Sequence, residues 1–182
     1  MSLKNLNVTK IPKNLVSKLS NNRIKNLFNI FEKNFKIKES FAVAVSGGPD
    51  SLALAFLTKI FSIKYSLKSK YFIVDHRLRK EATSEAKKVK KILNNFGIYA
   101  ELLTWKGKKP VSNIQSLARK KRYNLLFSKC KNLKILAFTT NALAVNKAIE
   151  FAKYAKKKGL DVLITISLDG DEETHDKLRG VK

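Results

Sequence analysis

The sequence predicts an α/β fold in which a parallel, twisted sheet carries helices on both faces and follows N-terminal helices. From residue 41 to residue 168, short apolar runs alternate with longer amphipathic segments, which is typical of βα repeats. Two of the amphipathic segments end at a glycine, Gly97 and Gly159, the residue type that most often follows a helix. With 182 residues and 44% hydrophobic content, the chain is large enough to bury a sizeable core.

The N-terminal part, residues 1–40, is expected to be a helical extension. After Pro12, apolar residues recur at helical spacing over residues 13–35, which predicts one or two amphipathic helices. We expect their apolar faces to pack on the domain that follows.

The remaining elements follow from the alternation of short and long segments. Because the strands are predicted to be parallel, ligands should bind beyond their carboxyl ends. We expect strands at 41–45, 71–74, 98–103, 134–138 and 162–168, and helices at 50–66, 83–96, 112–129 and 143–157.

A glycine-containing hexapeptide directly follows the first predicted strand. Its glycines can adopt positive φ and let backbone N–H groups approach a ligand, and a helix begins at once behind it. The helix dipole and the unpaired N–H groups of its first turn favour an anion. The alternative is an ordinary strand–turn–helix connection. The residues are Ser46, Gly47, Gly48, Pro49, Asp50 and Ser51.

Two further groups of polar residues are candidates for the same edge of the sheet. Asp75 and His76 end the second predicted strand and can reach a nucleotide there, or form only a capping or turn feature. Arg119 and Arg122 share one face of the helix 112–129, and their planar guanidinium groups suit phosphate. The alternative for these arginines is a solvated helix surface.

The charge of the chain is strongly positive and unevenly distributed. The net charge is +24 and the pI is about 10.2, which indicates a polyanionic partner such as nucleic acid. Residues 136–182 hold eight Lys or Arg and seven Asp or Glu, a net charge of +1. The first 135 residues carry the other 30 basic and 7 acidic side chains, a net charge of +23. A general lysine bias would predict a similar excess in both parts.

The cysteine content and the hydropathy exclude several classes of protein. Cys130 is the only cysteine, so an internal disulfide and a three-cysteine iron–sulfur cradle are excluded, and no iron–sulfur cluster is expected. No apolar run approaches the roughly 18 residues of a membrane span, and the N-terminus lacks the features of a signal peptide. We therefore expect a cytoplasmic protein without a membrane partner. The sequence does not indicate an oligomeric state.

Several spaced motifs resemble one family. The hexapeptide 46–51 resembles the Ser-Gly-Gly-x-Asp-Ser signature of the PP-loop ATP pyrophosphatases, the adenine nucleotide α-hydrolase-like proteins. Together with further blocks, it makes residues 1 to about 135 similar to the N-terminal domain of tRNA(Ile)-lysidine synthases. These blocks are Val-Asp-His-Arg-Leu-Arg at 74–79, Leu-Thr-Trp-Lys-Gly at 103–107 with Lys109-Pro110, and Gln115 followed by Ala-Arg-Lys-Lys-Arg-Tyr at 118–123.

The resemblance implies an ATP-dependent ligase. That family adenylates the C2 carbonyl oxygen of the wobble cytidine in an isoleucine tRNA with a CAU anticodon, and the amine of free L-lysine then displaces AMP. By resemblance, residues 46–51 with Asp75 and His76 would bind ATP, and Asp50 would also place Mg²⁺. Asp50, Arg119 and Arg122 would be the catalytic residues, with the arginines neutralising phosphate charge.

The chain departs from the family after about residue 135. Residues 136–141 read Leu-Ala-Phe-Thr-Thr-Asn, where the family has a His-His and Asp-Asp block that contributes to the active site. Residues 136–182 resemble a βαβ portion of a radical S-adenosylmethionine barrel without its cysteines. We therefore expect three parts: an extension at 1–40, a PP-loop ATP-binding domain at 41–135, and a βαβ continuation of foreign origin at 136–182. The alternative function is a non-catalytic ATP- and RNA-binding remnant of a chimeric gene product.

Overall fold

The computed structural model describes residues 12–107, 114–129, 134–140 and 145–166. Two helices come first, α1 (Lys13–Leu19) and α2 (Asn22–Asn34). The alternating part follows with β1 (Phe41–Ala44), α3 (Pro49–Lys64), β2 (Ser69–Asp75), α4 (Ala82–Asn94), β3 (Ala100–Thr104), α5 (Ile114–Lys129), β4 (Ile135–Thr140), α6 (Val145–Lys157) and β5 (Asp161–Ile166).

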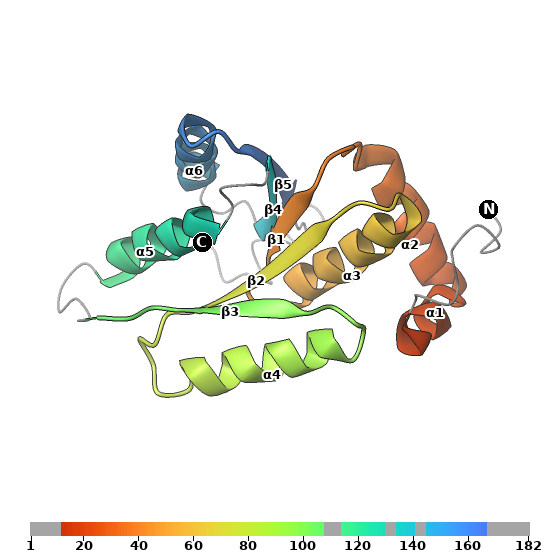
Figure 1. Cartoon of the computed structure of the whole chain (residues 1–182), viewed down its shortest axis with the longest axis horizontal. Coiled ribbons are helices and arrows are strands. Elements are labelled where there is room, and N and C mark those ends of the chain that lie inside the picture. Colours follow the sequence, from red (N-terminus) through yellow and green to blue (C-terminus); the bar gives the residue numbers. More distant parts are fainter. Residues whose placement is uncertain (1–11, 108–113, 130–133, 141–144, 167–182) are drawn as a thin grey trace, which may run out of the picture.

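The five strands form one parallel sheet in the order β3-β2-β1-β4-β5. The chain therefore places β1 in the centre, adds β2 and β3 on one side of it, and then crosses over to add β4 and β5 on the other (Figure 1). This arrangement confirms the predicted α/β class. It also brings the residues that follow β1, β2 and β4 to the same edge of the sheet.

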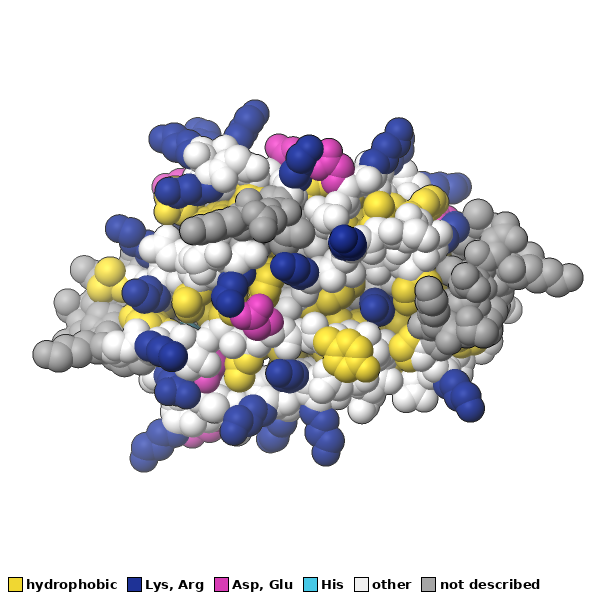
Figure 2. Space-filling model, in the orientation of Figure 1, with side chains coloured by type: hydrophobic (Ala, Val, Ile, Leu, Met, Phe, Trp, Pro, Cys, Tyr) yellow, Lys and Arg dark blue, Asp and Glu magenta, His cyan; other side chains and the backbone are white. Residues whose placement is uncertain are grey.

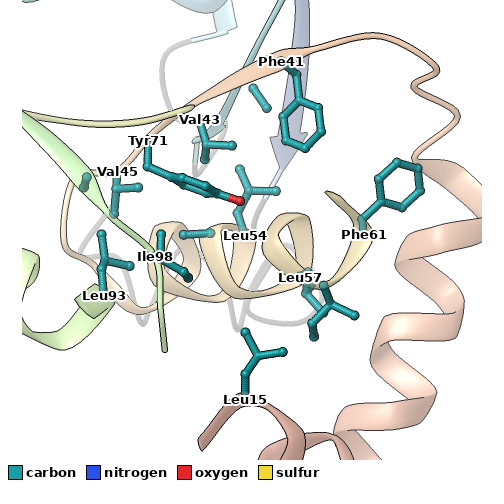
Figure 3. Packing of buried hydrophobic residues seen from close by; sticks show 14 of the residues in the cluster. Leu15, Phe41, Val43, Val45, Leu54, Leu57, Phe61, Tyr71, Leu93 and Ile98 are labelled. Atoms are coloured by element: carbon teal, nitrogen blue, oxygen red, sulfur yellow. The ribbon is translucent and has the colours of Figure 1, made fainter. Parts of the chain in front are cut away.

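Helices cover both faces, and the alternation of side chains along the strands explains how. On β1, Phe41 and Val43 point into the larger hydrophobic cluster, which includes residues of α1 to α4. Ala42 points into the second cluster, which includes residues of α5 and α6. Figure 3 shows the larger cluster, in which Leu54 of α3 points toward Val43 of β1, whereas Leu57 points from the other side of α3 toward Leu15 of α1.

The N-terminal helices pack on this domain, as their amphipathic pattern predicts. Leu15 and Leu19 of α1 and Phe28 of α2 are buried in the larger cluster. A break separates the two helices, because the side chain of Asn21 accepts hydrogen bonds from the N–H groups of Arg23 and Ile24 and so caps the start of α2.

The element bounds differ from the sequence predictions by one or two residues at most ends, as helix and strand termini usually do. Gly97 and Gly159 have φ values of +66° and +76°, the left-handed backbone expected where a helix ends. The predicted strand 162–168 is observed as β5, and its last two predicted residues lie outside the described part of the chain.

The sheet continues without interruption across residue 136, where we predicted a change of origin. β4 pairs with the central strand β1, in the register Phe41 with Ile135 and Val43 with Ala137. The C-terminal elements are therefore structurally part of the same sheet. Their separate ancestry stays a prediction, because a shared sheet does not record where its strands came from.

Candidate functional site

The predicted glycine turn joins β1 to α3 at the carboxyl edge of the sheet. Gly47 has a φ of +97°, a conformation that L side chains rarely adopt. Gly48 is the N-cap of α3. Because glycine has no side chain, no side-chain hydrogen bond caps the start of this helix. Pro49 occupies the first turn, where its missing N–H is no loss, and Asp50 is the acidic residue of that turn. This turn has the geometry of an anion-binding helix N-terminus.

The hydroxyl of Ser51 holds the turn together from inside. Ser51 is 2% exposed, and its Oγ donates to the carbonyl oxygen of Gly48 at 2.9 Å. The same Oγ accepts from the Gly47 N–H at 3.0 Å and from the Ser46 hydroxyl at 3.1 Å. Three bonds to one buried oxygen fix the backbone of the turn before any ligand arrives.

The turn also contacts α4. A Cβ added to Gly47 would lie 2.5 Å from Cγ2 of Val89, far inside van der Waals contact. Val89 is itself buried in the larger cluster. Position 47 therefore requires glycine for two independent reasons, its backbone conformation and its closeness to α4.

Asp75, the last residue of β2, is 1% exposed and fixes the segment that follows it. Its Oδ1 accepts from the N–H of Arg77 at 3.1 Å, and its Oδ2 accepts from the hydroxyl of Thr83 at 2.8 Å. The guanidinium Nε of Arg77 lies 3.5 Å from Oδ2. This buried carboxylate is thus engaged by protein groups from both ends of the β2–α4 connection, and Arg77 is held at a φ of +51°.

His76 lies beside this carboxylate and faces a cleft. Its Nδ1 accepts from the N–H of Leu78 at 3.1 Å, so the ring is neutral with its proton on Nε2. Burial lowers the pKa of His76 below 6.5, and the charges of Arg122 and Arg79 lower it further. Arg79 is paired with Glu85 of α4 at 2.8 Å.

The cleft has a volume of about 340 Å³ and opens at the carboxyl edge of the sheet. Ser46 and His76 lie on it, and Arg122 and Tyr123 line it from α5. Its apolar lining includes Phe72, Leu126, Leu136, Phe138 and Phe151. A pocket that combines an apolar lining with a few convergent polar groups is the usual form of a small-molecule site.

Three of the predicted residues, Ser46, His76 and Arg122, thus share one cleft. Gly47 to Ser51 form the turn directly behind Ser46, and Asp75 supports His76 from within the fold. Arg119 lies on α5, but its side chain is outside the described part of the structure. Its predicted role therefore stays a prediction.

Sequence reasoning missed two residues. Thr83 was not singled out, although a hydroxyl near the start of a helix is a common partner for an upstream carboxylate. Lys147 of α6 also lines the cleft. Nothing in the sequence distinguishes Lys147 from the other lysines of the chain, so only the fold could identify it.

The fit of a magnesium ion depends on Asp50. The described residues contain no group of three or more His, Cys, Asp or Glu side chains that could hold a metal by themselves. Mg²⁺ commonly uses one or two carboxylates and completes its shell with substrate phosphates and water. The single carboxylate of Asp50 at the glycine turn fits that mode. Cys130 lies outside the described residues.

Positive charge is widespread on the surface. Figure 2 shows Lys and Arg side chains over most of the visible face, whereas Asp and Glu form a few small groups. Such a surface attracts polyanions, but it does not by itself identify one binding face.

The fold and the turn together define an α/β protein with a glycine turn of anion-binding geometry at the end of its central strand. A family model described as the PP-loop domain matches residues 17–175, so the chain belongs to the PP-loop family. Membership of this family implies ATP binding. The match continues into the C-terminal segment, and the comparisons give no evidence for the radical S-adenosylmethionine resemblance.

Curated relatives support a distant, partial relationship to one group of tRNA-modifying proteins. The tRNA(Ile)-lysidine synthase of Orientia tsutsugamushi is 42% identical over 113 residues, 62% of this chain and 25% of that protein. The synthase of Bartonella quintana is 44% identical over 91 residues, 49% of this chain and 19% of that protein. The synthase of Rhodopseudomonas palustris is 39% identical over 102 residues, 55% of this chain and 30% of that protein. Each match thus spans less than a third of the relative.

A solved structure confirms the fold. The U34-tRNA thiolase NcsA from Methanococcus maripaludis, with its [4Fe-4S] cluster, superposes with a TM-score of 0.64 at 17% identity. The match covers 87% of this chain and 64% of that one. In the described part of the present chain, no helix has the length and apolar character needed to cross a membrane.

Proposed function

We propose that this PP-loop domain uses ATP to activate the wobble cytidine of an isoleucine tRNA for attack by free L-lysine. In the first step the C2 carbonyl oxygen of the base bonds to the α-phosphorus of ATP, and pyrophosphate leaves. In the second step the lysine amine attacks C2, loses a proton, and AMP leaves with the former carbonyl oxygen. Two displacement reactions thus replace a single displacement at C2 in which the carbonyl oxygen would be a poor leaving group.

The observation that carries this proposal is the turn at the end of β1. Its backbone is preset by the Ser51 hydroxyl, and it points the N-terminus of α3 toward the carboxyl edge of the sheet. Similarity to proteins named tRNA(Ile)-lysidine synthase supplies the substrate class. The net charge of +24 supports an RNA partner, since phosphate contacts dominate the affinity for nucleic acids.

The residues have separate tasks in this mechanism. The N–H groups of the turn and the hydroxyl of Ser46 would bind the pyrophosphate part of ATP. Asp50 would hold Mg²⁺, which when bound neutralises phosphate charge. Arg122, at the cleft, would stabilise the negative charge of a phosphate group in the transition state. His76, whose lowered pKa keeps its ring neutral, would contact the nucleotide without adding charge.

A lysine-incorporation assay tests the proposal. Purified protein, isoleucine tRNA, Mg·ATP and labelled lysine should give labelled tRNA and release pyrophosphate. A mutant tRNA without the wobble cytidine is the control. Mg·ATP binding with no incorporation and no pyrophosphate release would contradict the enzymatic activity.

A second candidate function is a non-catalytic ATP- and RNA-binding module. It is favoured by residues 136–141, which lack the family's His-His and Asp-Asp block; Phe138 and Thr139 from this segment line the cleft. Pyrophosphate release separates the two candidates. The module would bind Mg·ATP and RNA with no release, whereas the ligase would release pyrophosphate in the presence of tRNA.

The variant D50A tests the predicted role of the turn. We expect about a tenfold loss of Mg·ATP affinity or turnover, because a charge-assisted contact is removed. The free energy of unfolding should fall by only about 1 kcal/mol, since the residue lies in the first turn of a helix. Calorimetric titration and a denaturant melt measure the two effects.

The matched control is D161A, which removes an exposed carboxylate at the start of β5, at the opposite edge of the sheet. This variant should bind Mg·ATP as the wild type does. Unchanged ATP binding and turnover in D50A would contradict the assignment of the turn as the ATP site.

A further inference from the structure

The cleft is bounded on one face of the sheet by two helices that are held together by aromatic side chains. Tyr123 of α5 and Phe151 of α6 have ring centroids 4.1 Å apart, and Phe127 lies 5.5 Å from the same Phe151 ring. The hydroxyl of Tyr154 donates to Oδ1 of Asn124 at 3.2 Å. These contacts fix the position of α6 relative to α5.

Lys147 lies at the cleft end of this helix pair. It precedes Phe151 by four residues, so both project from the same face of α6, with Lys147 one turn nearer the carboxyl edge of the sheet. On α5, Arg122 directly precedes Tyr123, the contact partner of Phe151. Both Lys147 and Arg122 line the cleft. Among the described residues, no carboxylate forms an ion pair with Lys147.

The charge and shape of the cleft favour one class of ligand. Its basic lining residues are Arg79, Arg122 and Lys147, and its acidic one is Glu85, which is already paired with Arg79. Tyr123 and Phe138, which are half-buried, also line it, and Phe151, which is 3% exposed, packs against both of their rings. A base can stack on aromatic rings while its phosphate meets the cations, so the combination suits a nucleotide.

We propose that Lys147, together with Arg122, binds a phosphate group of a nucleotide in this cleft. The inference rests on the proposed function for the identity of the nucleotide, which is ATP or a residue of the RNA substrate. The inference assigns residues of the C-terminal segment to the binding site. Lys147 belongs to α6, and Phe151 of the same helix holds α6 against Tyr123 of α5. The charge balance of residues 136–182 gave no indication of such a role.

The variant K147Q tests the inference, with K153Q as the matched control. Lys153 is an exposed lysine of the same helix, six residues further from the cleft. Each variant is titrated with Mg·ATP and, separately, with isoleucine tRNA at one fixed salt concentration. We expect K147Q to lose about five- to tenfold in affinity for one of these two ligands, K153Q to lose less than twofold, and K147R to retain most of the affinity.

The two titrations identify the source of the phosphate. A selective loss of Mg·ATP affinity assigns Lys147 to the nucleotide cofactor, and a selective loss of tRNA affinity assigns it to the RNA. Equal losses in K147Q and K153Q would show only diffuse attraction and would overturn the inference, as would no loss in either titration. If the wild type binds neither Mg·ATP nor tRNA, both the inference and the proposed function fail. If the wild type binds them and K147Q binds both with unchanged affinity, only the inference fails. Thermal melts of all variants exclude unfolding as the cause.

Discussion

The two sides of the cleft are built differently. On the side of the glycine turn and the β2–α4 connection, the polar groups are buried and bonded to one another, with Ser51 2% and Asp75 1% exposed. On the side of α5 and α6, the helices are joined by aromatic rings, and the cations Arg122 and Lys147 are exposed. The first side fixes backbone geometry, and the second supplies charge at the surface.

This difference has a consequence for mutations. A change on the buried side should lower both stability and ligand binding, because a displaced backbone affects both. A change on the exposed side should alter binding or pKa values and leave stability nearly unchanged, as most surface substitutions do. The variants G47A, T83V and R122Q separate these outcomes.

The largest effect is expected for G47A. The positive φ at this position costs an L residue about 1 to 2 kcal/mol, and the overlap with Val89 adds about 1 to 3 kcal/mol. We expect a loss of about 2 to 4 kcal/mol in the free energy of unfolding and a loss of detectable Mg·ATP binding. Denaturant melts and calorimetric titration measure these quantities.

Gly107 provides the control for the close contact. It has nearly the same φ, +99°, but a Cβ there would meet no atom of the described residues within 4 Å. G107A should therefore show only the backbone cost, about 1 to 2 kcal/mol. Equal destabilisation by G47A and G107A would mean that the packing of the turn against α4 has no energetic importance.

A smaller effect is expected for T83V. This substitution removes the hydroxyl that donates to Oδ2 of Asp75 and leaves a buried carboxylate oxygen short of one partner. We expect a loss of about 1 to 3 kcal/mol in stability, with weaker nucleotide binding because the segment that carries His76 is less well fixed. A denaturant melt and a Mg·ATP titration are the measurements.

The neighbouring hydroxyl of Ser84 is the comparison for Thr83. Ser84 is exposed, and among the described residues its hydroxyl bonds to the backbone carbonyl of Glu81 alone. S84A should change stability by no more than about 0.5 kcal/mol. If T83V proves as mild as S84A, the buried carboxylate does not depend on Thr83, and the two sides of the cleft differ little in their contribution to stability.

The smallest effect is expected for R122Q, on the exposed side. The charge of Arg122 is one of the causes that lower the pKa of His76, after burial. Removing this charge should raise the His76 pKa toward its ordinary value of 6.5 and leave the melting temperature unchanged. An NMR titration of the imidazole signals, assigned with H76Q, measures the shift.

The sign of the pH dependence follows from the same shift. Because folding disfavours the charged form of His76, the unfolded chain binds more protons as the pH falls below 6.5. His76 therefore contributes stability above pH 6.5 that is lost on acidification through the lower folded-state pKa. R122Q should reduce this loss; a His76 pKa that R122Q leaves unchanged would contradict the closeness of the two groups.

Much of the fold could be predicted because its signals are local. Apolar runs, helical spacing and the glycines at 97 and 159 are properties of neighbouring residues, and each element they indicate is present in the described part of the chain. The turn at 46–51 is likewise one continuous segment. Local patterns of this kind specify elements, and the βα alternation then restricts their arrangement to a parallel sheet.

The rest depends on contacts between distant parts of the chain. The bond of Thr83 to Asp75, the closeness of Gly47 to Val89, and the place of Lys147 at the cleft all require the sheet order to be known. The charge break at residue 136 gave no indication that Lys147 lines the cleft, and the separate origin of residues 136–182 stays a prediction. The side chain of Arg119 lies outside the described part of the structure, so its role stays a prediction.

The position of β4 next to β1 has a consequence for how the chain can be cut. β1 is the central strand, and its second edge is covered only when residues 135–140 arrive. A fragment ending at the predicted junction near residue 135 would leave the backbone N–H and C=O groups of an apolar strand open along that edge. Such an edge recruits other strands, so the fragment should aggregate. During synthesis the same edge stays open until β4 leaves the ribosome, and the late part of the chain therefore protects the early part from misassembly.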